Sequence, residues 1–168
     1  MDPSSPQHRT AGFTRRVAER LDTLVADAAR AHGEAPGTAG LLVALSGGPD
    51  SVALVAVAAE WAEQHSRALV AAHFNHRLRA DQSDQDQAFC RDLCARLGVA
   101  LVCEGGDPRA VARQRGRGLE DAARELRHRF LARIREQHDL AAIATGHHRD
   151  DVSGNQVFHR YFHLRAVL

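Results

Sequence analysis

The sequence predicts an α/β fold in which a doubly wound parallel sheet has helices on both of its faces. Short apolar runs of strand length alternate strictly with longer segments whose apolar residues recur at helical spacing. That order implies right-handed crossovers between parallel strands. The run LLVAL (41–45) is apolar throughout and lies between glycine-containing loops, which is typical of a strand buried on both faces. The 168 residues are about the length of one domain.

The first predicted element is an amphipathic helix that starts at residue 13 and ends near Gly33. Its apolar residues share one face: Phe13, Val17, Leu21, Leu24 and Ala28. Residues 1–12 contain two prolines and no apolar run, so we expect a disordered tail. After the strand at 41–45, a helix is predicted from Pro49, because proline is favourable in the first turn.

The alternation of strands and helices continues along the chain. Apolar runs predict strands, and the amphipathic segments between them predict helices. The expected ranges are 68–74 (strand), 83–98 (helix), 99–104 (strand), 118–138 (helix) and 140–146 (strand).

The composition excludes several classes of protein. A formal charge of +1, with arginine as the only cation besides histidine, predicts by itself neither a nucleic-acid binder nor a membrane-surface protein. The three cysteines, Cys90, Cys94 and Cys103, lack C-x-x-C spacing, which argues against disulfides and zinc and fits a reducing cytoplasm. No apolar run is long enough to cross a membrane. We therefore expect a cytoplasmic protein without membrane contact. The sequence is compatible with either a monomer or an oligomer.

Polar residues gather where the predicted strands end. The segments 46–51, 73–76 and 145–151 each follow directly from an apolar run, and in doubly wound sheets ligands bind beyond the carboxyl ends of the strands. Two cysteines, Cys90 and Cys94, instead fall on the apolar face of their helix and are interpreted as buried packing residues.

The segment SGGPDS (46–51) has the features of an anion site. Gly47 and Gly48 allow a sharp turn with unhindered N–H groups, and the following helix points its positive end at the same place. A tight strand-to-helix turn is the simpler alternative. The Walker pattern is absent, because the spacing is shorter and no lysine follows. The carboxylate of Asp50 beside an anion site indicates a bridging Mg²⁺.

The pattern S-G-G-x-D-S after a buried strand resembles the pyrophosphate-binding loop of the N-type ATP pyrophosphatases, the PP-loop superfamily. Three further blocks resemble those of the tRNA(Ile)-lysidine synthetase family: 73–99 (HFNHRLRADQSDQDQAFCRDLCARLGV), 116–131 (GRGLEDAARELRHRFL) and 144–151 (ATGHHRDD). The resemblance covers residues 13–151, which we interpret as an incomplete catalytic domain. It implies an adenine nucleotide alpha hydrolase-like, Rossmann-like fold.

This resemblance also implies a reaction and a site. ATP adenylates the wobble cytidine of tRNA(Ile), and free lysine then displaces AMP to form lysidine. The nucleotide-binding residues implied are Ser46, Gly47, Gly48, Pro49, Asp50, Ser51, His73, Asn75 and Gly146. Of the two cofactors implied, ATP and Mg²⁺, the metal would be held by Asp50 with Asp151 or Asp150, and Asp50 and Asp151 would be catalytic.

Two constellations have more than one interpretation. The histidines and carboxylates of GHHRDD (146–151) allow a zinc or iron site, although adjacent ligands give poor tetrahedral geometry and a hard cation is favoured. The arginines from 109 to 135 form the most basic part of the chain. We interpret the loop RQRGRG (113–118) as a phosphate contact and the helix after it as a solvated face with pairs such as Glu125–Arg129.

The end of the chain departs from the family pattern. Gly154 stands where the family has a glutamate that helps to bind lysine, and residues 152–168 diverge from it. We interpret the chain as truncated after the fourth strand, frame-shifted or intentionally shortened. An inactive ATP-binding or pyrophosphate-binding remnant is therefore one alternative function. Another amidating PP-loop ligase is a second, although the 73–79 block and the absence of paired cysteines argue against it.

Overall fold

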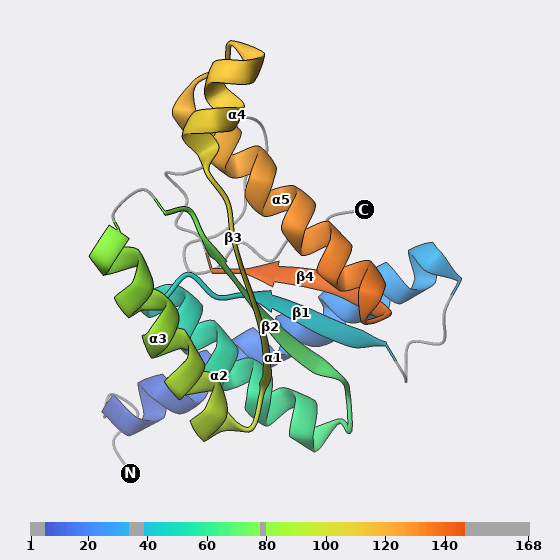
Figure 1. Ribbon diagram of the computed structural model, residues 1–168. Coiled ribbons are helices and arrows are strands. Elements are labelled where there is room, and N and C mark those ends of the chain that lie inside the picture. Colours follow the sequence, from blue (N-terminus) through green and yellow to red (C-terminus); the bar gives the residue numbers. More distant parts are fainter. Residues whose placement is uncertain (1–5, 34–38, 78–79, 147–168) are drawn as a thin grey trace.

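The computed structural model describes residues 6–33, 39–77 and 80–146, and they form a four-stranded parallel sheet with helices on both faces (Figure 1). The strand order is β3-β2-β1-β4, with β1 paired to both β2 and β4. The elements follow in the order α1 (Pro6–His32), β1 (Gly40–Ala44), α2 (Pro49–Gln64), β2 (Leu69–Asn75), α3 (Ala80–Leu97), β3 (Ala100–Gly105), α4 (Pro108–Arg115), α5 (Leu119–Gln137) and β4 (Leu140–Thr145). The predicted doubly wound α/β fold is confirmed.

All four strands lie within one residue of their predicted bounds. The start of α1 differs more, because this helix begins at Pro6 rather than at residue 13 and includes residues 6–12, for which we expected disorder. Proline at the first helical position costs no hydrogen bond, and a helix nucleated by the buried residues Val17 and Leu21 extends backward at little cost.

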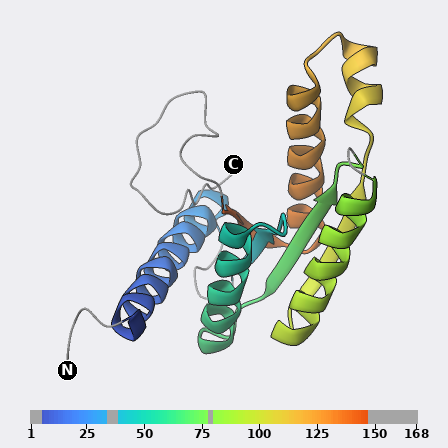
Figure 2. The same cartoon turned by 90° about the vertical axis from the view of Figure 1, so that its left-hand side faces the viewer.

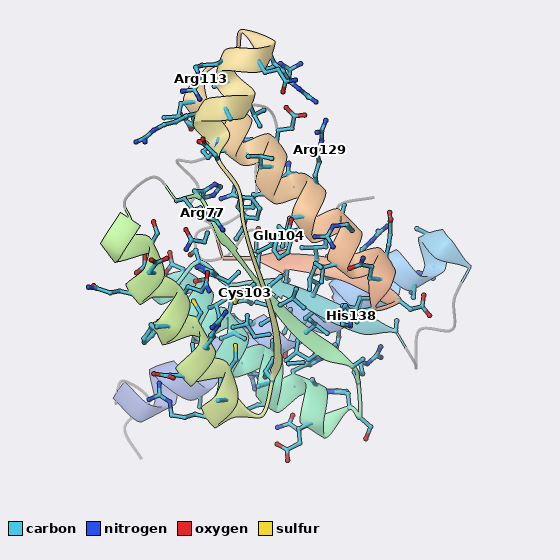
Figure 3. The ribbon with its side chains drawn as sticks, in the orientation of Figure 1. Arg77, Cys103, Glu104, Arg113, Arg129 and His138 are labelled. Carbon is cyan, nitrogen blue, oxygen red and sulfur yellow. The ribbon has the colours of Figure 1, made fainter. Side chains whose placement is uncertain are left out.

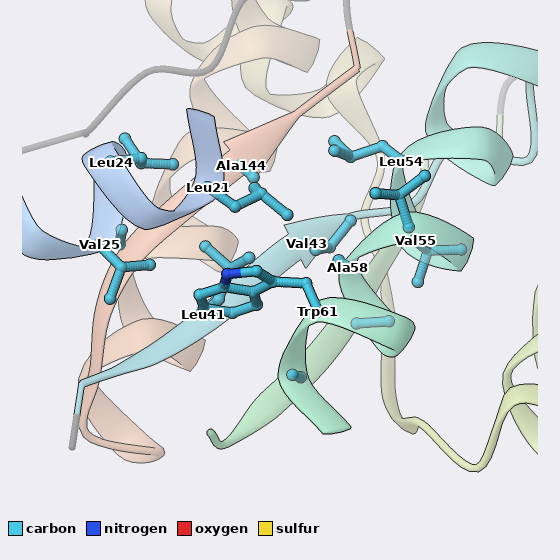
Figure 4. Packing of buried hydrophobic residues seen from close by; sticks show 14 of the residues in the cluster. Leu21, Leu24, Val25, Leu41, Val43, Leu54, Val55, Ala58, Trp61 and Ala144 are labelled. Atoms are coloured by element: carbon cyan, nitrogen blue, oxygen red, sulfur yellow. The ribbon is translucent and has the colours of Figure 1, made fainter. Parts of the chain in front are cut away.

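The sheet separates two hydrophobic clusters, and β1 contributes to both. Leu41 and Val43 face α1 and α2, where they pack with Leu21 and Trp61, as Figure 4 shows. Leu42 faces the other way, into the cluster formed with α5. Burial on both faces explains why β1 is apolar at every position rather than at alternate ones.

Figure 2 shows α1, α2 and α3 on one side of the sheet and α5 on the other. Trp61 from α2 is almost completely buried, and its Nε1 donates a hydrogen bond of 2.8 Å to Asp22 on α1. This bond satisfies the one polar atom of the indole and aligns the two helices. Cys90 and Cys94 of α3 are buried in the same cluster, as predicted.

The helix α4 was not predicted, since eight residues are too few to establish a periodicity. Its sequence nevertheless contains both end signals. The Asp107 side chain accepts a hydrogen bond from the Arg109 N–H at 2.9 Å, and Gly116 adopts the left-handed conformation (φ +62°) that ends the helix. Packed against α5, α4 extends beyond the carboxyl edge of the sheet (Figures 1 and 2). Among the described residues, no helix is long and apolar enough to cross a membrane.

Candidate functional site

The strand order creates a switch point at the carboxyl end of β1. The chain moves from β1 outward to β2 and β3, and then returns to pair β4 with the free side of β1. Ligands in such sheets bind at this point. A cavity of about 200 Å³ opens there, lined by the ends of β1 and β2, the residue after β4, the first part of α3 and one side of α5.

The loop between β1 and α2 lies at the mouth of this cavity and is braced from within. The hydroxyl of Ser51, which is 2% exposed, accepts a hydrogen bond from the Ser46 N–H at 3.1 Å and donates one to the Gly48 carbonyl at 2.9 Å. No side chain caps the start of α2. The positive end of this helix begins at Gly48, which has no side chain to cap it, and has one acidic residue, Asp50, in its first turn.

The two glycines of the loop differ in backbone conformation, and only Gly47 adopts one that favours glycine. Gly47 has φ +92°, a conformation that side chains with a Cβ rarely adopt. Gly48 has an ordinary extended conformation, with φ −73°. The sequence does not distinguish these two positions, because it shows only that the turn is tight.

The end of β4 presses directly on this loop. A β-carbon at Gly146 would lie 3.0 Å from the carbonyl carbon and oxygen of Asp50 and 3.0 Å from the Ser51 nitrogen. These are backbone atoms, so they cannot rotate away. Gly146 therefore packs tightly on the loop and lines the cavity, a feature that only the fold reveals, while its role in nucleotide binding stays a prediction.

His73, at the end of β2, is a buried polar residue whose tautomer the structure determines. Its Nδ1 lies 2.9 Å from the Leu45 carbonyl oxygen and 3.5 Å from the Cys90 sulfur. A carbonyl only accepts, so Nδ1 carries the proton and donates it. In the neutral ring the other nitrogen, Nε2, is an acceptor, and it is buried beside the cavity without a hydrogen-bond partner among the described residues. A ligand with an N–H or O–H group would satisfy it.

Asn75 lines the same cavity, but its amide group is engaged within the protein. The Nδ2 atom lies within hydrogen-bond distance of Ser83 O, Asp84 Oδ1 and Gln87 Oε1, and Oδ1 accepts from the Arg77 N–H at 2.9 Å. These bonds join the end of β2 to the first part of α3. Direct nucleotide contact by this side chain stays a prediction.

Sequence reasoning missed two contributors to the cavity, Asp86 and Arg127, whereas His76 belongs to the segment 73–76 that was expected at this edge of the sheet. Burial, the Arg127 guanidinium and His73 together lower the pKa of His76 below its usual range. His76 also meets the Phe74 ring edge-on, with the ring centroids 5.0 Å apart. Arg127 lies in the quoted block 116–131 and Asp86 lies in the block 73–99, so the motifs contained both residues without assigning them a role in the site.

The donor set fits a magnesium ion that is shared with phosphates. Asp50 is half-buried in the first turn of α2, and Asp86 lies beside the loop, with its Cβ 3.7 Å from where a Gly47 β-carbon would be. Mg²⁺ needs only one or two protein carboxylates when phosphates supply the other ligands. Over residues 6–33, 39–77 and 80–146, no cluster of three or more His, Cys, Asp or Glu could hold a metal alone. Asp150, Asp151 and the two histidines beside them lie outside the described residues.

The surroundings of Cys90 and Cys94 do not favour a nucleophilic or metal-binding role. Burial, the neighbouring Cys94 and Cys103 thiols and Asp86 raise the pKa of Cys90 to about 12, and burial followed by Cys103 raises that of Cys94. A thiol in this state is neither a nucleophile nor a metal ligand at neutral pH.

A family model of the PP-loop domain matches residues 13–161 of the chain. The tRNA(Ile)-lysidine synthase of Chlorobaculum tepidum is 38% identical over 121 residues, which are 72% of this chain and 37% of that protein. That of Dehalococcoides mccartyi is 39% identical over 111 residues, or 66% and 24% of the two chains. The tRNA(Ile)-lysidine synthase of Porphyromonas gingivalis is 43% identical over 111 residues, which are 66% of this chain and 24% of that protein. The matches thus span 24% to 37% of these relatives' length.

A solved structure has the same fold. The U34-tRNA thiolase NcsA from Methanococcus maripaludis, with its [4Fe-4S] cluster, superposes with a TM-score of 0.59 over 83% of this chain and 46% of its own. The sequence identity is 16%, so this likeness concerns the fold alone.

Proposed function

Because the chain belongs to the PP-loop domain family, we propose that it is an ATP-dependent ligase of the tRNA(Ile)-lysidine synthase type. One observation carries this proposal: the loop 46–51 and the cavity beside His73 meet at one edge of the sheet. The loop suits phosphates, and the cavity has a buried acceptor suited to the donors of a nucleoside. Together they match the two halves of ATP.

In this proposal the wobble cytidine is activated first. Its C2 carbonyl oxygen attacks the α-phosphorus of ATP, a new P–O bond forms, and the bond to pyrophosphate breaks. The neutral ε-amine of lysine then attacks C2, AMP departs with the electrons of the C–O bond, and the amine loses a proton. The N–H groups of the loop and the positive end of α2 would stabilise the charge that develops on the departing pyrophosphate.

The residues of this chain would divide the work. Gly47 and Gly48 allow the phosphates to approach the backbone, while Ser51 keeps the loop in shape. Asp50, with Asp150 or Asp151, would hold Mg²⁺, which neutralises phosphate charge when bound. His73 would orient the nucleoside through Nε2.

Two readouts on the purified chain test the two steps separately. With a tRNA(Ile) transcript, ATP and lysine, we expect tRNA-dependent release of pyrophosphate and incorporation of labelled lysine into tRNA. Gly47→Val, which places a β-branched residue at φ +92°, is the loop-deficient control, with circular dichroism to verify its fold. ATP binding without either product would favour the alternative of a non-catalytic remnant and would contradict the proposal.

A further inference from the structure

The α4–α5 hairpin, residues 107–129, has a marked excess of positive charge. It contains seven arginines against four carboxylates, a formal charge of +3, whereas the whole chain has +1. The stretch from Pro108 to Leu119 holds four arginines and no carboxylate. The hairpin rises beyond the carboxyl edge of the sheet, the same edge at which the cavity opens (Figures 1 and 2).

One carboxylate organises arginines from both helices of the hairpin. Glu125 of α5 lies 2.5 Å from Arg115 at the end of α4, 2.5 Å from Arg129 on α5, and 3.6 Å from Arg117 in the turn. Its side chain is only 18% exposed, whereas those of Arg117 and Arg129 are 59% and 60% exposed. Each of the three arginines therefore forms an ion pair with the half-buried Glu125, while much of its side chain stays exposed to solvent.

A single carboxylate cannot satisfy three guanidinium groups. Each guanidinium has five N–H donors in a rigid plane, so most donors around Glu125 stay available, and two positive charges are not neutralised. Figure 3 shows Arg113 on α4 and Arg129 on α5, both outside the body of the sheet. The sequence suggested a division between a phosphate-contacting loop and a solvated helix, and Glu125 joins the two into one surface.

We propose that this surface, formed by Arg113, Arg115, Arg117 and Arg129, binds the sugar–phosphate backbone of an RNA beside the cavity. Planar guanidinium forks suit phosphate oxygens, and Glu125 acts as a positioning residue that holds three of them in one array. Leu119 is the one large apolar side chain of the hairpin that is exposed, so a surface for an apolar partner is not formed. The choice of tRNA as the RNA rests on the proposed function, but the phosphate chemistry does not.

The test is a titration of a fluorescent tRNA(Ile) transcript with the full chain at salt concentrations of roughly 50 to 200 mM. The variant Arg115→Gln/Arg117→Gln should weaken binding on the order of tenfold and reduce the slope of log K against log salt by about 1.5. Arg113→Gln, which leaves the Glu125 ion pairs intact, should weaken binding about threefold. The control Arg91→Gln/Arg96→Gln makes the same charge change as the double variant on α3 and should alter affinity by less than about twofold.

The outcomes separate this surface from the ligase activity. Replacing the wobble cytidine of the transcript by uridine should leave the affinity unchanged, because backbone contacts do not read bases. Arginine-dependent binding without lysine ligation would support the surface and contradict only the proposed function. Equal losses in the hairpin and α3 variants would overturn the surface, whatever the ligation assay shows. The proposal would also be overturned if the hairpin variants lost binding to anionic phospholipid vesicles but kept wild-type affinity for tRNA.

Discussion

Gly146 lies so close to Asp50 that a β-carbon on the glycine would be 3.0 Å from the aspartate's carbonyl carbon. The two residues are nearly a hundred positions apart in the chain. Their contact joins the end of β4 to the first turn of α2, and with it one wall of the cavity to the loop proposed to bind phosphate. The position of the loop therefore depends on a glycine outside it.

This contact predicts that Gly146→Ala damages nucleotide binding more than stability. The added methyl group meets backbone atoms that cannot rotate away, so the strand or the loop must shift, at a cost of about 1–3 kcal/mol. We expect the affinity for Mg·ATP to fall at least about tenfold, since a shift of that cost displaces the loop donors. Titration calorimetry measures the affinity, and thermal unfolding measures the stability.

Gly12→Ala is the matched control for that variant. Gly12 lies within α1, where an added β-carbon meets only the end of the Arg16 side chain at 3.5 Å. This change should stabilise the helix by up to about 1 kcal/mol and leave ATP binding unaltered. Wild-type affinity in Gly146→Ala would show that the loop tolerates displacement, contrary to our account.

Asp50→Asn should have opposite effects with and without magnesium. With Mg²⁺ present, loss of the carboxylate removes a ligand, and ATP should bind about tenfold more weakly, or roughly 1.4 kcal/mol. With the metal chelated, the wild-type carboxylate repels the phosphates, so the variant should bind ATP more tightly. Asp92→Asn, an exposed change on α3, controls for net charge. Equal affinities of wild type and Asp50→Asn with Mg²⁺ would assign the metal to other residues.

His73→Phe should separate the nucleoside half of the site from the phosphate half. The variant keeps a ring in the cavity wall but removes Nε2, the buried acceptor without a partner. We expect about tenfold weaker binding of ATP and unchanged binding of inorganic pyrophosphate, which reaches only the loop. His138→Gln, at the exposed end of α5, is the control. If pyrophosphate binding fell as much as ATP binding, the variant would have disturbed the loop and His73 would have no separate role.

His76 should make the folded chain less stable in mild acid. Its pKa in the folded state lies below the unfolded value of about 6.5, so the unfolded chain binds more protons between the two values. Stability is therefore present above pH 6.5 and is partly lost as the pH falls toward the folded pKa. Urea unfolding at about pH 7.5 and about pH 5.8 measures this difference. His76→Gln should reduce it, and an undiminished loss in the variant would assign the effect to another group.

Much of the site could be predicted from the sequence because it is local. The turn with Gly47 and Gly48, the start of α2 at Pro49 and the apolar β1 all follow from neighbouring residues, and each is where the pattern indicates. Parallel strands share one carboxyl edge, so the polar segments after β1, β2 and β4 could be expected at the same place. Their association around one cavity agrees with that expectation over the described residues.

Other features depend on contacts between distant parts of the chain, and no local pattern contains them. The tautomer of His73 depends on the Leu45 carbonyl, and Arg127 reaches the cavity because α5 crosses the face of the sheet opposite α3.

The sequence by itself determined all four described strands and four of the five described helices, that the strands are parallel, and which loop turns sharply at a helix start. These properties follow from periodicity, backbone sterics and the positions of glycine and proline, which act over a few residues. Only the tertiary structure decided that Gly146 presses on Asp50, that Nε2 of His73 is left as a buried acceptor, and that Glu125 gathers three arginines. Such contacts arise when packing of the two hydrophobic clusters brings distant side chains together, and their geometry is set by the sheet order rather than by local preference.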